Sequence, residues 1–159
     1  MKEILRILEK DARKTPQHIA TMLGMPVSEV EAAIKKAESD RTILKYKTMV
    51  NWDRLGEEQV WALVEVRVAP QRDVGFDAIA ERIYRFPEAR SVYLVSGAYD
   101  LAVFVVGNTM QQVASFVSEK LAPLESVHGT VTHFLLKRYK EDGEILGIEE
   151  RPKRVPLMP

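Results

Sequence analysis

A short polar cluster at residues 96–100 (Ser-Gly-Ala-Tyr-Asp) interrupts the most apolar part of the chain and combines a hydroxyl, a phenol and a carboxylate. The flanking runs, 90–96 and 99–106, are rich in β-branched and aromatic residues, which predicts two adjacent strands joined by a tight turn. We expect Gly97 to supply a positive φ in that turn. A few polar groups in an apolar frame are typical of a small-ligand pocket. The alternative is an ordinary hairpin whose aspartate accepts backbone amides.

A second set of candidate residues consists of cations near the beginning of the chain. Residues 1–55 carry 11 Lys and Arg against 8 Asp and Glu, and residues 56–159 carry 12 against 15, so the net charge of zero conceals an asymmetry. The surplus of cations in the first segment favours a polyanion as its partner.

Several kinds of chemistry are excluded by what the sequence lacks. The chain has no cysteine, so a disulfide scaffold, a thiolate metal site and a cysteine nucleophile are excluded. The three histidines, His18, His128 and His133, do not have the spacing of a metal site, and there is no glycine-rich phosphate loop or nucleophile elbow. We therefore expect no cofactor and no enzyme. The absence of a signal-peptide core and of an apolar run of about 20 residues favours a soluble, cytoplasmic protein that does not enter a membrane.

Helical spacing of apolar residues organises the first segment. The predicted helices are 2–10, 16–23 and 28–39. The second helix is expected to begin after Thr15 as its N-cap and to end at Gly24. The third is expected to begin with Ser28 as its N-cap, paired with Glu31 in a capping box. Two capped helices around a glycine turn predict a helix-turn-helix.

Residues 43–50 alternate between polar and apolar and predict a strand after these helices. We interpret residues 1–55 as a winged helix-turn-helix DNA-binding domain, in which 43–58 form the wing or linker. Its predicted partner is double-stranded DNA, with the third helix in the major groove and cations on the phosphates. The candidate DNA-binding residues are Lys14, Gln17, Ser28, Lys35, Lys36, Arg41, Lys45 and Lys47, together with Arg13.

A helical packing module without DNA affinity is the alternative for this segment. Glu29 and Glu31 would bring negative charge to the phosphates, and Ala32 and Ala33 have no hydrogen-bonding groups with which to read bases.

The second segment has the order strand-helix-strand-strand-helix-strand. The predicted strands are 59–68, 90–96, 99–106 and 127–139, and the helices begin near Asp73 and at Asn108 or Thr109. Their expected inward residues are Phe76, Ile79, Ala80 and Ile83 in the first helix and Met110, Val113, Ala114, Val117 and Leu121 in the second. This order predicts a ferredoxin-like domain over residues 59–140, with two helices on one face of a four-stranded antiparallel sheet. The fold class is therefore α+β.

The other face of this sheet would carry Trp61 and Leu63 and is too apolar to stay exposed. We expect a symmetric dimer that packs sheet on sheet. Residues 141–159 contain three prolines and are expected to form an extended tail.

Three short motifs then suggest a family. They are Val-Ser-Gly-Ala-Tyr-Asp-Leu at 95–101, Val-His-Gly-Thr-Val-Thr at 127–132, and Ile-Leu-Lys-Tyr at 43–46 followed by Leu-Gly at 55–56. In this order and spacing, the chain resembles the Lrp/AsnC (feast/famine) family of bacterial and archaeal transcription regulators over residues 1–140.

The resemblance implies a sensor and oligomerisation domain, homodimers that assemble further, often into octameric rings, and small effectors, commonly amino acids, bound between dimers. The residues that line or flank the implied effector site are Ser96, Gly97, Ala98, Tyr99, Asp100, Thr130 and Thr132. We expect the ammonium of an amino acid to pair with Asp100 and its carboxylate to accept backbone N–H groups of the turn.

The chain departs from the family pattern in its third helix. Ala32 and Ala33 stand where the family has arginine-rich sequence, and Arg41 stands where a terminating glycine is usual. We therefore expect either an effector-modulated, oligomeric DNA-binding transcriptional regulator or, alternatively, a ligand-sensing oligomer with weak or lost sequence-specific DNA binding.

Overall fold

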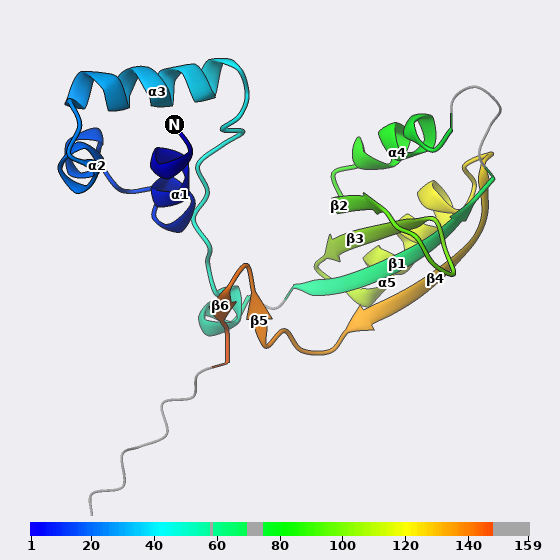
Figure 1. The fold of residues 1–159 in the computed structure, drawn as a ribbon. Helices are drawn as coiled ribbons and strands as arrows, with labels where there is room; N and C mark the ends of the chain where they lie inside the picture. The colour runs from blue at the N-terminus through cyan, green and yellow to red at the C-terminus, as the bar shows by residue number, and fades with distance from the viewer. Residues whose placement is uncertain (58, 70–74, 148–159) are drawn as a thin grey trace, which may run out of the picture. The chain divides into compact units, whose positions relative to one another are not determined.

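The computed structural model describes residues 1–57, 59–69 and 75–147, which form two compact units that divide after Val50 (Figure 1). In these ranges no helix has both the length and the apolar character to cross a membrane.

The first unit is a cluster of three helices. These are α1 (Lys2–Lys10), α2 (Pro16–Leu23) and α3 (Val27–Ser39). Their apolar faces meet in a core of Ile4, Leu8, Ile19, Ala20 and Val30. The predicted limits of α1 and α2 are confirmed. The residues that determine the limits of α2 lie at the ends of the helix itself. Thr15 Oγ1 accepts the His18 N–H at 3.3 Å, and Gly24 ends α2 with a φ of 65°.

The predicted start of α3 is wrong by one residue. Pro26 is the N-cap, and no side chain caps the helix. The Pro26 carbonyl accepts the N–H groups of Glu29 and Val30 at 3.1 and 3.3 Å. Ser28 therefore lies inside the first turn, and the capping box with Glu31 does not form.

The predicted strand at residues 43–50 is also absent. A strand needs a neighbour to take its backbone hydrogen bonds, and the described residues place none beside it. This segment is instead attached to α3 through Tyr46, whose hydroxyl donates to Glu38 Oε1 at 2.9 Å. Desolvation, followed by this hydrogen bond, raises the pKa of Tyr46.

Arg41 follows α3 in the left-handed conformation, with a φ of 60°. We expect Arg41→Gly to raise the free energy of unfolding of the first unit by about 0.5–1 kcal/mol, because glycine adopts this conformation without a Cβ clash. Urea unfolding followed by amide NMR signals of α1–α3 measures the change. Lys36→Gly is the matched control inside α3 and should destabilise by about 1 kcal/mol. Equal destabilisation by both substitutions would contradict the strain at Arg41.

The second unit is built on a four-stranded antiparallel sheet. Its strands are β1 (Val60–Val68), β2 (Ala89–Leu94), β3 (Leu101–Gly107) and β4 (Val127–Leu135), in the order β2-β3-β1-β4. The helices α4 (Asp77–Tyr84) and α5 (Met110–Phe116) cover one face (Figure 1), and α5 continues as a π-helical turn at Val117–Leu121. The predicted ferredoxin-like, α+β fold is confirmed.

The core of this unit lies between the sheet and the helices. Alternation along β1 buries Val64 and Val66 against the helices, as predicted, and leaves Trp61 and Leu63 on the opposite face. The helical residues in this core include Ile79, Ile83, Val113, Phe116, Val117 and Leu121. Met110 and Ala114 were predicted to point inward, but both are exposed, and Phe116 occupies the inner position instead. Asp73 lies outside the described residues; α4 has Phe76 as its N-cap.

Residues 136–147 differ from the long last strand and the extended tail that the sequence predicted. β4 stops at Leu135, and β5 (Lys140–Glu141) and β6 (Glu144–Ile145) form a small hairpin. Its turn, Asp142-Gly143, has φ values of 50° and 89°, which a two-residue hairpin turn requires. The predicted extended tail is therefore wrong for these residues, and 148–159 lie outside the described part.

Candidate functional site

The predicted effector loop connects β2 to β3 and is held by Asp100. Asp100 Oδ2 accepts the Val68 N–H at 2.8 Å, and the Asp100 N–H donates to the Val66 carbonyl at 3.1 Å. The pairing of β1 with β3 ends at Val66 and Leu101, so no residue of β3 pairs with Val68, and the Val68 amide is available to the carboxylate. Asp100 therefore accepts a backbone N–H group, as the hairpin interpretation of the sequence predicted. The described residues leave Asp100 Oδ1 without a hydrogen bond.

Gly97 does not have the positive φ that the sequence predicted. The connection runs over residues 95–100, which is longer than the tight turn we expected, and a longer connection does not need left-handed backbone there. A Cβ added to Gly97 would meet nothing within 4 Å, so no side chain closes over it.

The structure brings Asp100 and Thr130 to the same end of the sheet. Thr130 pairs with Val66 from β4, and Asp100 bonds to Val66 from the other side. Two inter-strand spacings separate them, which is about 10 Å. Thr132 lies one pleat further along β4, opposite Val64. Ser96, Gly97 and Ala98 are exposed, whereas Tyr99 and Asp100 are half-buried.

All the residues predicted to bind DNA are exposed on the first unit. They are Lys14, Gln17, Ser28, Lys35, Lys36, Arg41, Lys45 and Lys47, with Arg13. Lys14 lies 3.7 Å from Asp11 in an ion pair. The exposed surface of α3 contains Ala32 between Ser28 and Lys36 at helical spacing, so its middle offers a small, neutral contact surface.

The sequence did not identify Arg138 as a residue that joins three segments. Its guanidinium lies 4.8 Å from the centroid of the Trp61 ring, Nη1 donates to Glu141 Oε2 at 2.8 Å, and Nη2 lies 3.6 Å from Asp53 Oδ1. These partners come from β1, β5 and the short helix Trp52–Leu55. No spacing signal links such distant positions, so only the structure reveals the cluster.

We expect Arg138→Ala to lower the free energy of unfolding of the second unit by about 1–2 kcal/mol, because it removes a stacked cation and a charge-assisted hydrogen bond. Arg138→Lys keeps the charge but not the planar donor group, so it should recover less than half of the loss. Tryptophan fluorescence during urea unfolding measures this unit, since both tryptophans, Trp52 and Trp61, belong to it. The control is Arg85→Ala, which removes an exposed pair with Glu81. A loss no larger than in this control would show that the cluster is not stabilising.

The sheet face without helices is apolar, as predicted. Its side chains come from all four strands: Trp61, Leu63, Tyr93, Phe104, Val106, Val131 and Leu135. We call this set the open sheet face. Tyr93 is 54% exposed and Val131 48% exposed. One polar pair interrupts the face, in which His133 Nε2 lies 3.1 Å from Glu65 Oε1.

A helix-turn-helix unit with exposed cations, followed by a ferredoxin-like unit, defines a DNA-binding regulator with a separate ligand-binding domain. Comparison with known proteins agrees with this class. Residues 1–43 match the family model for a winged helix-turn-helix DNA-binding domain, and residues 61–145 match the model for the Lrp/AsnC ligand binding domain. The chain belongs to the Lrp/AsnC family of transcriptional regulators, which are not enzymes.

Similar proteins cover nearly the whole chain. An uncharacterized HTH-type transcriptional regulator of Bacillus subtilis, YugG, is 49% identical over 99% of this chain and 95% of its own length. The leucine response regulatory protein LrpA of Mycobacterium tuberculosis has a similar fold, with a TM-score of 0.74 at 21% identity over 92% of this chain and 97% of that one. The regulator NMB0573 of Neisseria meningitidis was solved as a complex with L-methionine. Its fold matches with a TM-score of 0.70 at 19% identity, over 87% of this chain and 89% of that one.

Proposed function

We propose that this DNA-binding transcriptional regulator acts as a homo-oligomer whose DNA affinity changes when an amino acid binds at the loop 96–100. The observation that carries the proposal is the position of Asp100 beside an exposed loop. One of its carboxylate oxygens holds Val68, and the other accepts no hydrogen bond from the part of the chain that the structure describes. An α-ammonium suits this carboxylate, and exposed backbone N–H groups suit an α-carboxylate. The methionine complex of the Neisseria relative supports an amino acid as the ligand class.

The open sheet face supports the oligomeric part of the proposal. A contiguous apolar surface of this kind favours a second copy of the chain, packed sheet on sheet about a two-fold axis. The family pattern then favours assembly of dimers into a larger ring, with an octamer as the expected size. The loop 96–100 and Thr130 lie at one end of the sheet, where a second dimer would complete the ligand site.

The first unit supplies the DNA contacts in this proposal. Lys35 and Lys36 on α3, with Lys45 and Lys47 after it, neutralise phosphates, while Ser28 faces the bases. A second candidate function is a ligand-sensing oligomer with weak sequence-specific DNA binding. The specific observation behind it is that Glu29 and Ala32 are exposed on α3, where a base-reading surface would otherwise lie.

Fluorescence anisotropy with a duplex from the upstream region of its own gene, and a random duplex of equal length, tests the proposal. The salt concentration is varied, and each of the amino acids is added in turn. We expect tighter binding to the upstream duplex, a steep fall with salt, and a shift in affinity with at least one amino acid. Equal affinity for the two duplexes would favour the sensor alternative.

The effector site is tested separately with Asp100→Asn. Asparagine can still accept the Val68 N–H through Oδ1, so the loop should keep its conformation while the carboxylate charge is lost. We expect DNA binding to persist and the amino-acid response to weaken at least about tenfold. Asp142→Asn in the exposed β5–β6 turn is the matched control. An unchanged response in Asp100→Asn would place the effector elsewhere.

A further inference from the structure

Arg67 is an exposed cation near the end of β1, on the side of the sheet that the helices leave open. Its chain neighbours Val66 and Val68 are buried against the helices, so the alternation of a strand directs Arg67 to the opposite side. Within the part of the chain that the structure describes, its guanidinium has no hydrogen bond and no ion pair. This cation is therefore available to a ligand.

Asp100 lies beside Arg67, across the end of the sheet. The Asp100 N–H donates to the Val66 carbonyl at 3.1 Å, and Asp100 Oδ2 accepts the Val68 N–H at 2.8 Å. The aspartate is therefore bonded to both chain neighbours of Arg67, which puts the two backbones one inter-strand spacing apart, roughly 5 Å. A cation without a partner and a carboxylate with one unbonded oxygen thus lie at the same end of the sheet.

The space next to Arg67 is open on both sides. Its partner in the pairing of β1 with β4 is Gly129, and a Cβ added to Gly129 would meet nothing within 4 Å. On the other side, residues 96–98 of the effector loop are exposed. No side chain covers Gly129, so the guanidinium and a small ligand have room over this end of the sheet.

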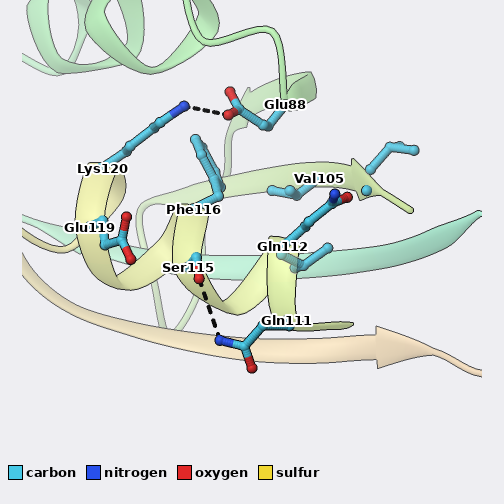
Figure 2. A pocket seen from close by; sticks show the side chains of 11 residues that line it. Glu88, Val105, Gln111, Gln112, Ser115, Phe116, Glu119 and Lys120 are labelled. Atoms are coloured by element: carbon cyan, nitrogen blue, oxygen red, sulfur yellow. Dashed lines mark hydrogen bonds and ion pairs between the residues drawn. The ribbon is translucent and has the colours of Figure 1, made fainter. Parts of the chain in front are cut away.

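The opposite end of β3 provides a comparison, because there a carboxylate is already paired with a cation of the chain. A pocket of about 390 Å³ lies at that end, beside α5 (Figure 2). Among its lining residues Lys120 Nζ contacts Glu88 Oε1, and this hydrogen bond lowers the pKa of Glu88 although burial opposes the shift. Arg67 and Asp100 form no such pair, so a ligand that carries both charges can satisfy both residues.

We propose that Arg67 binds the α-carboxylate of the effector while Asp100 binds its α-ammonium. The two groups of an α-amino acid are attached to one carbon, so they need partners of opposite charge that lie side by side. A guanidinium donates two parallel N–H groups to a carboxylate, and backbone N–H groups of the loop add to this contact. This role of Arg67 rests on the proposed effector function and narrows it to amino acids with a free α-carboxylate.

Isothermal titration calorimetry on the full chain tests this role with two probes, L-methionine and L-methioninamide. The amide keeps the ammonium and the side chain but lacks the carboxylate. We expect the wild-type chain to bind methionine at least about tenfold more tightly than the amide. The other amino acids and their amides are titrated in the same way. A wild-type chain that binds no amino acid would overturn the proposed effector function and, with it, the role of Arg67.

Variants of Arg67 separate carboxylate binding from a structural role. Arg67→Gln should weaken methionine binding about tenfold and leave methioninamide binding unchanged, since the amide has no carboxylate for the guanidinium. Arg67→Lys keeps the charge and should recover part of the loss. The control Arg90→Gln removes an exposed arginine near the start of β2, away from the effector loop, and should change neither affinity.

Two results would overturn the role of Arg67 and still leave the amino-acid response in place. One is methionine binding that is unchanged in Arg67→Gln. The other is an equal fall in the affinities for methionine and methioninamide, because a purely structural arginine would affect both probes alike.

Discussion

Replacing Val131 with glutamate should convert the proposed homo-oligomer into monomers. Val131 is 48% exposed in the single chain, so the folded unit accepts a polar side chain there. In a symmetric sheet-on-sheet dimer the substitution occurs twice and buries two carboxylates, each opposite Glu65 on the neighbouring strand. We expect the dimer to weaken by at least about a hundredfold, since buried unpaired charges cost about 3 kcal/mol or more. Light scattering after size exclusion measures the change.

The matched control for this substitution is Met110→Glu. Met110 is 56% exposed and lies on α5, on the helix-covered side, so the same charge is added away from the open sheet face. We expect this variant to retain the wild-type mass, and circular dichroism should show both variants folded. A wild-type mass for the folded Val131→Glu variant would mean that the open sheet face is not the interface.

Replacing Lys35 and Lys36 together with alanine should weaken DNA binding by about tenfold or more at physiological salt. Both side chains are exposed on α3. Each substitution therefore removes one phosphate contact in the proposed complex. The slope of log affinity against log salt should therefore decrease by about 2 for each DNA-binding unit. Anisotropy over a salt series gives both quantities.

The control for this pair is Lys2→Ala/Lys10→Ala, which removes two exposed cations from α1. It changes the net charge equally, so any general loss of attraction for DNA appears in both variants. An equal decrease of slope in the two double variants would show that α3 has no specific position on the phosphates.

The parts of the fold that were predictable from sequence depend on neighbouring residues. The limits of α2 are determined by Thr15 and Gly24, which act within one turn of the chain. The alternation of β1 identified both faces of the sheet before any pairing was known, because side chains of a strand alternate. Arg41 has the left-handed backbone at the position where the family pattern usually has a terminating glycine.

The missed features depend on residues that are far apart in the chain. The strand expected at 43–50 had the right pattern, but a strand forms only where another supplies its hydrogen bonds, and a pattern does not contain that information. Arg138 contacts residues as distant as Asp53, and Asp100 bonds to Val68, which lies 32 positions earlier. The same holds for Glu88 and Lys120, whose pocket exists only after α5 has packed on the sheet.

In the proposed effector mechanism, the bond between Asp100 and the Val68 amide would also report ligand binding. In the ligand-free chain this amide proton is held by a carboxylate, so its exchange with solvent deuterium is slow. An ammonium that draws the carboxylate toward itself lengthens this bond, and the exchange of Val68 accelerates. The Val66 carbonyl stays bonded to the backbone N–H of Asp100, so the rest of the strand is unaffected. If the effector binds as proposed, hydrogen exchange at the Val68 amide would therefore measure occupancy of the ligand-binding domain in the absence of DNA.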